Sequence, residues 1–319
     1  MPILLLLLVM TLAGCGKTQA RAIRLVIFQG AEAPLLAQKL GFFEKAGVRV
    51  EIQETPGNSK AMEALLGGSA DSIVGTYDQA IQLQAKGQRV VAYRLLTECH
   101  CLALIVPPSK AKEIRKIGDL AGRTIGVGAP GGSMQIFAAY LLQKAGAAEA
   151  SYAGIGVGAT AFAAIDSGKV DAAVVLVSTL VRLRQRYPEL RVLAETFTET
   201  GSFDALGFSR FPSMALLAKG EWLDRNPGTA QKISDAVGQA AVWIRSHTAA
   251  EVSAKLGGNL DVAALELHLP RYSTSGIFEP GAARFVQQLL EQARRIPSGS
   301  VPSIEATYSN RFLKPDLPR

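Results

Sequence analysis

The segment GRTIGVGAPGGSMQ, residues 122–135, has three glycines in the G-x-G-x-x-G spacing of dinucleotide-binding loops: Gly126, Gly128 and Gly131. In a dinucleotide site such a loop joins a strand to a helix, and an acidic residue at the end of the next strand holds a ribose hydroxyl. Here Glu149 precedes the next predicted strand segment instead of ending it, and Pro130 stands where the helix should already continue. The spacing therefore does not predict a nicotinamide or flavin site, and we expect no cofactor.

The same loop can still bind a small polar group, because it opens an apolar helix. Gly131, Gly132, Ser133 and Met134 put free backbone N–H groups at the helix start, and Ser133 adds a hydroxyl. Such N–H groups favour an anion or another polar group. The alternative is that Ser133 merely caps the helix. Capping and binding are compatible, so both interpretations stay open.

Short polar segments lie at the ends of other predicted strands. Each segment alone is ordinary turn or cap chemistry, but ligands of open parallel sheets bind where the carboxyl ends of strands converge. The shared location therefore predicts further ligand-binding residues. These candidates are Gln29, Gly30, Gly57, Asn58, Ser59, Thr76, Tyr77, Asp78, Thr97, Glu98 and Ser178.

Cys99, His100 and Cys101 form the stretch that most invites a metal or redox hypothesis. Side chains at i and i+2 of a strand share one face, where a disulfide has awkward geometry, and His100 would point to the opposite face. We expect two buried thiols that pack as small apolar groups, and no metal site. The sequence also lacks a nucleophile elbow, an H-E-x-x-H motif and paired carboxylates, so we predict no catalytic residues.

Strands and helices alternate around these candidates. Strands are predicted at 23–29, 48–55 and 71–76, with helices at 33–47 and 58–69 between them, which indicates a parallel sheet. Residues 24–47 also align with residues 123–146 at an offset of 99, and both copies end in Lys-Ala-Gly. With one extra residue of offset, Gly68 and Asp71 align with Gly168 and Asp171. The internal repeat predicts two lobes of the same design.

We therefore expect an α/β protein of two lobes, each a parallel-rich sheet with helices on both faces. The apolar strand at 101–108 ends in two prolines and should carry the chain out of the first lobe, and a strand in 213–223 should return it. The predicted first lobe comprises residues 22–106 and 206–319, and the second comprises residues 107–205. A ligand is expected between the facing carboxyl ends of the two sheets.

The N-terminus predicts export. An apolar run from Ile3 to Leu12 is too short to span a bilayer and fits the core of a signal peptide over residues 1–14. Leu12-Ala13-Gly14-Cys15 resembles a bacterial lipobox. That resemblance implies cleavage before Cys15, lipidation of Cys15 and a linker over residues 15–21. A signal peptide without lipidation is the alternative.

The chain is basic, with a formal net charge of +7 at pH 7. Such a charge could suit nucleic acid, an anionic surface or an anionic ligand. The basic residues are spread along the chain, and the densest cluster, at 182–191, reads as a solvated helix face. Since neither a basic stripe with interleaved aromatics nor a nucleic-acid motif is visible, we expect no nucleic-acid partner.

Four segments together resemble the periplasmic solute-binding components of ABC importers. They are GFFEKAGVRVEI, EALLGGSADSIVG, IGDLAGRTIGVGAPGGS and GKVDAAVV. The resemblance is to the branch with alkanesulfonate-, taurine- and nitrate-binding proteins and the thiamine-pyrimidine-precursor group. It implies a periplasmic-binding-protein (Venus-flytrap) fold, a monomer on the periplasmic side of the membrane, and a permease and its ATPase as partners. Carried over, it implies that Gly131–Ser133, Gly57–Ser59 and Thr76 contact the solute.

The residues at the strand ends favour more than one ligand class. The Gly-Gly-Ser helix start and the positive charge favour a sulfonate-like or nitrate-like anion, whereas Asp78 and Glu98 would suit an amine or a ring N–H. Two other functions stay open. One is an enzyme of the pyrimidine-synthase type, although such enzymes carry a dense cysteine cluster that this chain lacks. The other is a sensory or assembly lipoprotein.

Overall fold

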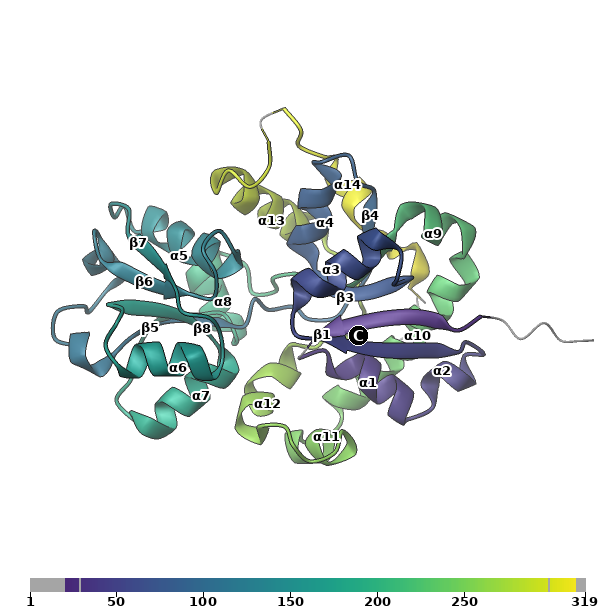
Figure 1. Cartoon of the computed structure of the whole chain (residues 1–319), viewed down its shortest axis with the longest axis horizontal. Helices are drawn as coiled ribbons and strands as arrows, with labels where there is room; N and C mark the ends of the chain where they lie inside the picture. Colours follow the sequence, from purple (N-terminus) through teal and green to yellow (C-terminus); the bar gives the residue numbers. More distant parts are fainter. Residues whose placement is uncertain (1–20, 29, 298, 314–319) are drawn as a thin grey trace, which may run out of the picture.

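Two five-stranded sheets lie along the long axis of the molecule, each with helices packed on it (Figure 1). This computed structural model describes residues 21–313 except 29 and 298. The strands are β1 (Ile23–Phe28), β2 (Val50–Thr55), β3 (Ser72–Thr76), β4 (Val90–Leu95), β5 (Leu102–Val106), β6 (Thr124–Val127), β7 (Ser151–Gly154), β8 (Ala172–Leu176), β9 (Arg191–Glu195) and β10 (Met214–Lys219).

The helices up to β9 are α1 (Glu32–Lys39), α2 (Phe42–Lys45), α3 (Asn58–Gly67), α4 (Tyr77–Gln84), α5 (Ser133–Lys144), α6 (Ala159–Asp166) and α7 (Val177–Arg186). Those that follow are α8 (Glu199–Leu206), α9 (Gly220–Arg225), α10 (Pro227–Arg245), α11 (Ala249–Lys255), α12 (Val262–His268), α13 (Pro280–Gln292) and α14 (Ile304–Thr307).

The first sheet has the strand order β2-β1-β3-β10-β4, with β10 antiparallel to its neighbours. Alternate side chains of β1 point to opposite faces of the sheet. Leu25 and Ile27 pack with α1 and α10, whereas Val26 packs with α3 and α4 on the other face. Helices on both faces explain why the central strands read as continuous apolar runs.

The second sheet has the order β7-β6-β8-β5-β9, in which β5 is antiparallel to β8 and β9. On β8, Val174 faces the core that includes α5, while Ala173 and Val175 face the core that includes α6 and α7. We call this sheet with its helices the second lobe, and the other sheet with its helices the first lobe. The α/β fold with two lobes is thus confirmed.

The internal repeat of the sequence corresponds to equivalent hydrogen bonds in the two lobes. In the first lobe the Arg24 N–H donates to the Asp71 carboxylate over 2.9 Å, and in the second lobe the Thr124 N–H donates to Asp171 over 2.9 Å. The registers of β1 with β3 and of β6 with β8 also correspond, at an offset of 100 residues. The predicted offset of 99 therefore holds at the closing Lys-Ala-Gly but is wrong by one residue for β1 and β6, whereas the predicted offset of 100 for β3 and β8 is confirmed.

The predicted lobe boundary at residue 106 is wrong by one strand. Residues 102–106 form β5, which pairs with β8 and β9 in the second sheet rather than ending the first lobe. Composition does not decide which lobe this strand joins, because an apolar strand fits either core equally well. The chain crosses from the first lobe to the second at residues 96–101 and returns at residues 207–213, between α8 and β10.

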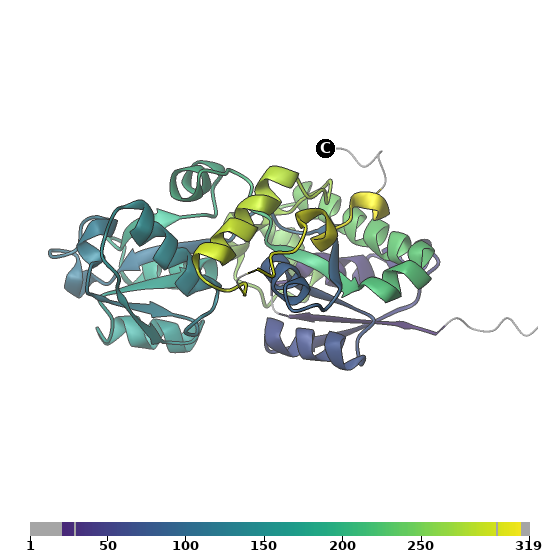
Figure 2. The same cartoon turned by 90° about the horizontal axis from the view of Figure 1, so that it is seen from above.

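Two helices from the C-terminal part of the first lobe reach the second lobe (Figures 1 and 2). Ala264 and Leu267 of α12 pack with the core around α7. Phe285 of α13 packs its ring against Tyr140 of α5, with the ring centroids 5.8 Å apart. The lobes are therefore joined by side-chain packing as well as by the two crossovers.

The predicted signal peptide, Cys15 and all of the linker except Arg21 lie outside the described residues. Among the residues that are described, no helix is long and apolar enough to cross a membrane.

Candidate functional site

The carboxyl ends of the parallel strands in both sheets lie next to the crossovers. Met214, which begins β10, is paired with Thr76, which ends β3. In the second sheet Leu102, which begins β5, is paired with Leu176, which ends β8. Each crossover thus runs from one carboxyl edge to the other. This topology places the predicted site residues of both lobes on edges that are connected to each other.

On the edge of the first lobe, the structure brings together three predicted residues. The Asn58 side-chain amide donates to the Thr76 hydroxyl over 2.9 Å, and Thr76 in turn hydrogen-bonds to Asp78. Burial raises the pKa of the Asp78 carboxyl, although Thr76 and Gln82 both hydrogen-bond to it. The helix starts of α3 and α4 are therefore linked through side chains, as their shared position at strand ends predicted.

On the edge of the second lobe, part of the predicted cradle is already occupied. The Gly131 N–H donates to the side-chain oxygen of Gln135 over 2.6 Å, and the Gly132 N–H donates to the Ala129 carbonyl over 3.1 Å. Gly132, not Ser133, is the N-cap residue of α5, so the interpretation that Ser133 caps the helix is wrong. Among the described residues, the N–H groups of Ser133 and Met134 have no protein acceptor, as is usual for a first helical turn.

Arg295 lies beside this loop, and sequence reasoning missed it. Gly131 has a φ of +78°, and a side chain built on it would meet the Arg295 guanidinium at 3.1 Å. Arg295 follows α13 of the first lobe and is exposed. No local signal could have found it, because only the packing of α13 on α5 brings this cation to the second lobe.

The same edge also carries exposed apolar side chains. Val157 is 52% exposed and Leu176, at the end of β8, is 38% exposed. Met134 lies on the same edge, where its sulfur accepts the Gly128 N–H over 3.2 Å. The predicted residue Ser178 is exposed two residues after Leu176, in the first turn of α7. A solute on this edge would therefore meet apolar surface as well as free N–H groups.

Three other predicted residues are held in structural contacts. Tyr77 is fully buried, its hydroxyl bonds to Thr307 over 2.6 Å, and burial raises its pKa. The Thr97 hydroxyl accepts the Met214 N–H over 3.1 Å, and Glu98 accepts a hydrogen bond from Ser273 over 2.7 Å. Their side chains hold the core or the crossover in place, so we leave them out of the solute contacts.

The remaining predicted residues that the structure describes lie at the first-lobe edge. Gly57 is the N-cap residue of α3, and Ser59 is exposed in its first turn. Gly30 has a φ of +94°, which favours glycine. Gln29 lies outside the described residues.

A buried polar cluster that the sequence did not reveal holds the loop after β1. Tyr272 donates to the Glu32 carboxylate over 2.6 Å, and the Glu32 N–H donates to the same tyrosine hydroxyl over 3.0 Å. His268 lies 3.8 Å from that carboxylate. Burial raises the pKa of Tyr272. Its members come from both ends of the chain, so neither spacing nor periodicity could bring them together.

The expectation of two buried thiols is wrong, because Cys99 and Cys101 form a disulfide with their Cα atoms 5.0 Å apart. The prediction assumed that both cysteines lie in a strand. In fact β5 begins at Leu102, and Cys101 has a φ of +51°, so the chain turns between the two cysteines. This turn brings the two sulfurs together within the first crossover.

His100 packs between aromatic rings rather than near other metal ligands. It stacks on Phe211 of the second crossover with a centroid separation of 4.8 Å, and it meets Phe137 edge-on. Burial lowers the pKa of His100 to about 4. The described part of the chain contains no group of three or more His, Cys, Asp or Glu side chains that could hold a metal.

One cavity on the described part of the surface, of about 340 Å³, lies elsewhere. Asp224, Gln231, Arg311 and Phe312 line it, in the first lobe beside the start of α10. Asp224 is already paired with both Arg89 and Arg311. Because this cavity is remote from the second lobe, we do not place the solute there.

Comparison with known proteins gives consistent results. The family described as NMT1/THI5 like matches residues 32–250. YtlA of Bacillus subtilis, which is named as a binding protein, is 24% identical over 263 residues, covering 78% of this chain and 74% of YtlA. A solved structure from Bordetella bronchiseptica RB50 is 27% identical, with a TM-score of 0.75 and coverage of 92% of this chain and 96% of that one.

The alkanesulfonate-binding protein SsuA from Xanthomonas axonopodis pv. citri, solved with bound MOPS, has a TM-score of 0.71 to this chain. It is 19% identical, with coverage of 90% of this chain and 98% of that one. At that identity the likeness is one of fold. The fold is that of the periplasmic binding proteins, as the resemblance implied.

Proposed function

Because the chain belongs to the NMT1/THI5-like family, we propose that it is the extracytoplasmic solute-binding protein of an ABC importer. It would bind a small solute between the carboxyl edges of its two lobes and deliver it to a permease and its ATPase. The observation that carries the proposal is the pair of crossovers that connect these edges. Two sheets connected in this way can close on a ligand without unfolding.

Anchoring through a lipid on Cys15 is part of the proposal, as is a monomeric receptor on the periplasmic side. Both rest on the sequence. The lipobox-like segment at residues 12–15 supports the anchor. Mass spectrometry of the membrane-extracted protein would test it, with Cys15→Ser as the variant that should be released from the membrane.

For the ligand we propose an organic anion of the sulfonate type. The free N–H groups of Ser133 and Met134, the Ser133 hydroxyl and the neighbouring Arg295 support an anionic group on the second lobe. Val157 and Leu176 support an apolar portion beside it. Asp78 on the first lobe argues for N–H groups at the other end of the solute.

A thermal-shift panel tests this proposal. Alkanesulfonates, taurine, nitrate, amines and aminopyrimidines would be compared on the purified protein. A ligand present at about 100 times its Kd should add roughly 2.7 kcal/mol of stability. Ser133→Ala should weaken the response, whereas Ser109→Ala, at an exposed position beyond the opposite edge of the same sheet, should not. If no sulfonate raised the melting temperature while an amine did, the anion assignment would be wrong.

The binding-protein proposal also predicts that the solute is released unchanged. Mass spectrometry of the ligand after long incubation should return its original mass and one equivalent per protein. A new product would favour the alternative of a pyrimidine-synthase-type enzyme on the same fold.

A further inference from the structure

The hinge between the lobes is a ribbon of three segments, residues 96–98, 209–214 and 271–273. The first lies in the first crossover, the second comprises the end of the second crossover and the first residue of β10, and the third belongs to the first lobe. Backbone hydrogen bonds tie the first segment to both others: Glu98 N–H to the Arg271 carbonyl over 2.8 Å, and Phe211 N–H to the Glu98 carbonyl over 3.0 Å. The two crossovers are thus paired with each other and with residues 271–273.

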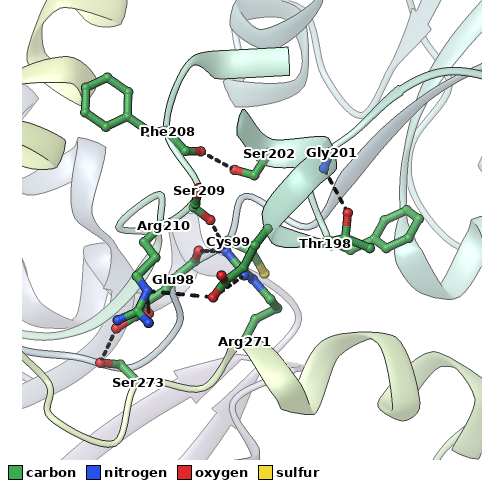
Figure 3. A network of polar contacts seen from close by, with 12 residues as sticks. Glu98, Cys99, Thr198, Gly201, Ser202, Phe208, Ser209, Arg210, Arg271 and Ser273 are labelled. Carbon is green, nitrogen blue, oxygen red and sulfur yellow. Dashed lines mark hydrogen bonds and ion pairs between the residues drawn. The ribbon is translucent and has the colours of Figure 1, made fainter. Parts of the chain in front are cut away.

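Arg271 clamps this ribbon with its side chain (Figure 3). One guanidinium nitrogen donates to the Glu98 carbonyl over 2.6 Å and to the Ser209 carbonyl over 2.5 Å. These carbonyls belong to different crossovers. Arg271 is only 5% exposed, so the guanidinium is fixed on the first lobe side of the hinge.

The other terminal nitrogen of the Arg271 guanidinium faces the second lobe. Arg271 lies 3.4 Å from the carboxylate of Glu199, the first residue of α8. Helix α8 is fastened to the second lobe, because Lys144 of α5 donates to the Asp204 carbonyl over 2.7 Å. Arg210 lies 3.7 Å from Glu199 and 3.6 Å from Glu98. Glu199 is therefore the carboxylate through which this hinge cluster reaches the second lobe.

The side chains that make these ion pairs differ in their exposure to solvent. Glu98 is held by Ser273 and is 18% exposed, whereas the side chains of Glu199 and Arg210 are 60% and 68% exposed. The inner contacts of Arg271 should persist when the hinge bends. The contacts to Glu199 need the lobes in this orientation, because their partners move with different lobes.

We propose that Glu199, with Arg271 and Arg210, forms an electrostatic latch that favours this orientation of the lobes. Bending the hinge separates Glu199 from both arginines, so the latch sets the population of this orientation. A solute that binds another orientation more tightly loses part of its binding free energy in breaking these ion pairs. A solute that binds this orientation more tightly does not have that cost. The inference goes beyond the proposed function, because it concerns the lobes with no solute bound.

The test measures the distance between the lobes directly. Spin labels on azide-bearing amino acids at exposed positions 86 and 169, one on each lobe, would be read by double electron–electron resonance. The native disulfide stays intact. The variant is Glu199→Gln, and the matched control is Glu189→Gln, which removes an exposed carboxylate of the second lobe that makes no ion pair with any described residue. Arg210→Gln is a second variant.

The expected result is a lower share of the main distance component in Glu199→Gln. For exposed ion pairs we expect the population ratio to fall about two- to fivefold at low salt. Raising NaCl to about 1 M should produce the same change in the wild-type protein and little further change in the variant. Arg210→Gln should shift the distribution less, and Glu189→Gln should not shift it.

Thermal unfolding serves as the check on folding, since Glu199 is exposed and its loss should leave the midpoint nearly unchanged. If Glu199→Gln is nevertheless unfolded, the distance distribution of Arg210→Gln is compared with that of the wild type instead, and the expected shift is smaller. Distance distributions that superimpose for wild type and both variants at every salt concentration would overturn the latch. Because no solute is present, this outcome is separate from failure of the proposed function.

Discussion

Replacing Asp71 with alanine should destabilise the first lobe by an amount that its contacts allow us to estimate. The carboxylate, whose side chain is 12% exposed, accepts the Arg24 backbone N–H over 2.9 Å and two guanidinium N–H groups over 3.1 and 2.8 Å. Hydrogen bonds to charged groups contribute about 1.5–3 kcal/mol each when half-buried, and they are not additive. We expect Asp71→Ala to lower the free energy of unfolding by about 2–4 kcal/mol.

Asp71→Asn separates the two parts of this interaction. Its side-chain oxygen can still accept the Arg24 N–H, but the charge is gone, so the loss should be about half as large. The matched comparison is Asp171→Ala, which removes the equivalent bond to Thr124 in the second lobe. Its ion pairs, to Lys110 at 3.4 Å and Arg123 at 3.8 Å, are longer, so we expect a smaller loss than for Asp71→Ala.

The assay is urea unfolding followed by circular dichroism over a range of pH. Burial raises the pKa of Asp71, but the hydrogen bonds and charge of Arg24 outweigh it, so the pKa lies below its ordinary value of 3.8. At low pH the unfolded chain then binds the proton more readily than the folded chain. The contribution is present above that ordinary value and is lost as the pH falls through the lower folded-state pKa.

Two results would refute this reasoning. A loss below about 0.5 kcal/mol for Asp71→Ala at neutral pH would mean that the carboxylate does not fix the start of β1. A difference between wild type and Asp71→Asn that grows as the pH falls below 3.8 would have the wrong sign.

Three further predictions concern the edge, the contact between lobes and the hinge. Gly131→Ala should lower the free energy of unfolding in urea by about 1 kcal/mol, because its φ is +78°, and the new methyl group should displace Arg295. Gly57→Ala, at a φ of −178° with open space around it, should leave the free energy of unfolding unchanged or raise it slightly. Phe285→Ala should lower the free energy of unfolding by about 3–5 kcal/mol, since the ring is 8% exposed and packs against the second lobe; the same change at Phe203, 58% exposed, should cost almost nothing. Burial lowers the pKa of His100 to about 4 from 6.5, so NMR should find it neutral at pH 5, and stability should rise from pH 4 to 6.5; His100→Phe should flatten that rise.

The sequence by itself determined the elements and their duplication. Apolar runs of strand length, separated by helical patterns, predicted β1 to β3 within one or two residues, and the internal repeat predicted a second copy of this arrangement. Asp71 and Asp171 align in the repeat because they have equivalent roles. Each carboxylate accepts a backbone N–H from a strand residue 47 positions earlier. The candidates on the two edges followed from the rule that parallel strands present their carboxyl ends together.

Tertiary structure alone decided which sheet an apolar strand joins and which polar groups are available. β5 could satisfy either core by composition, and only its pairing with β8 and β9 assigned it to the second lobe. Tyr77 and Thr97 have side chains that suit a ligand, yet Thr307 and Met214, distant in sequence, already bond to them. Arg271 and Arg295 carried no local signal, since a cation acquires its role from the carbonyls and carboxylates that folding places around it. Composition and periodicity report on contacts between near neighbours, whereas the hinge is made of segments separated by more than fifty residues along the chain.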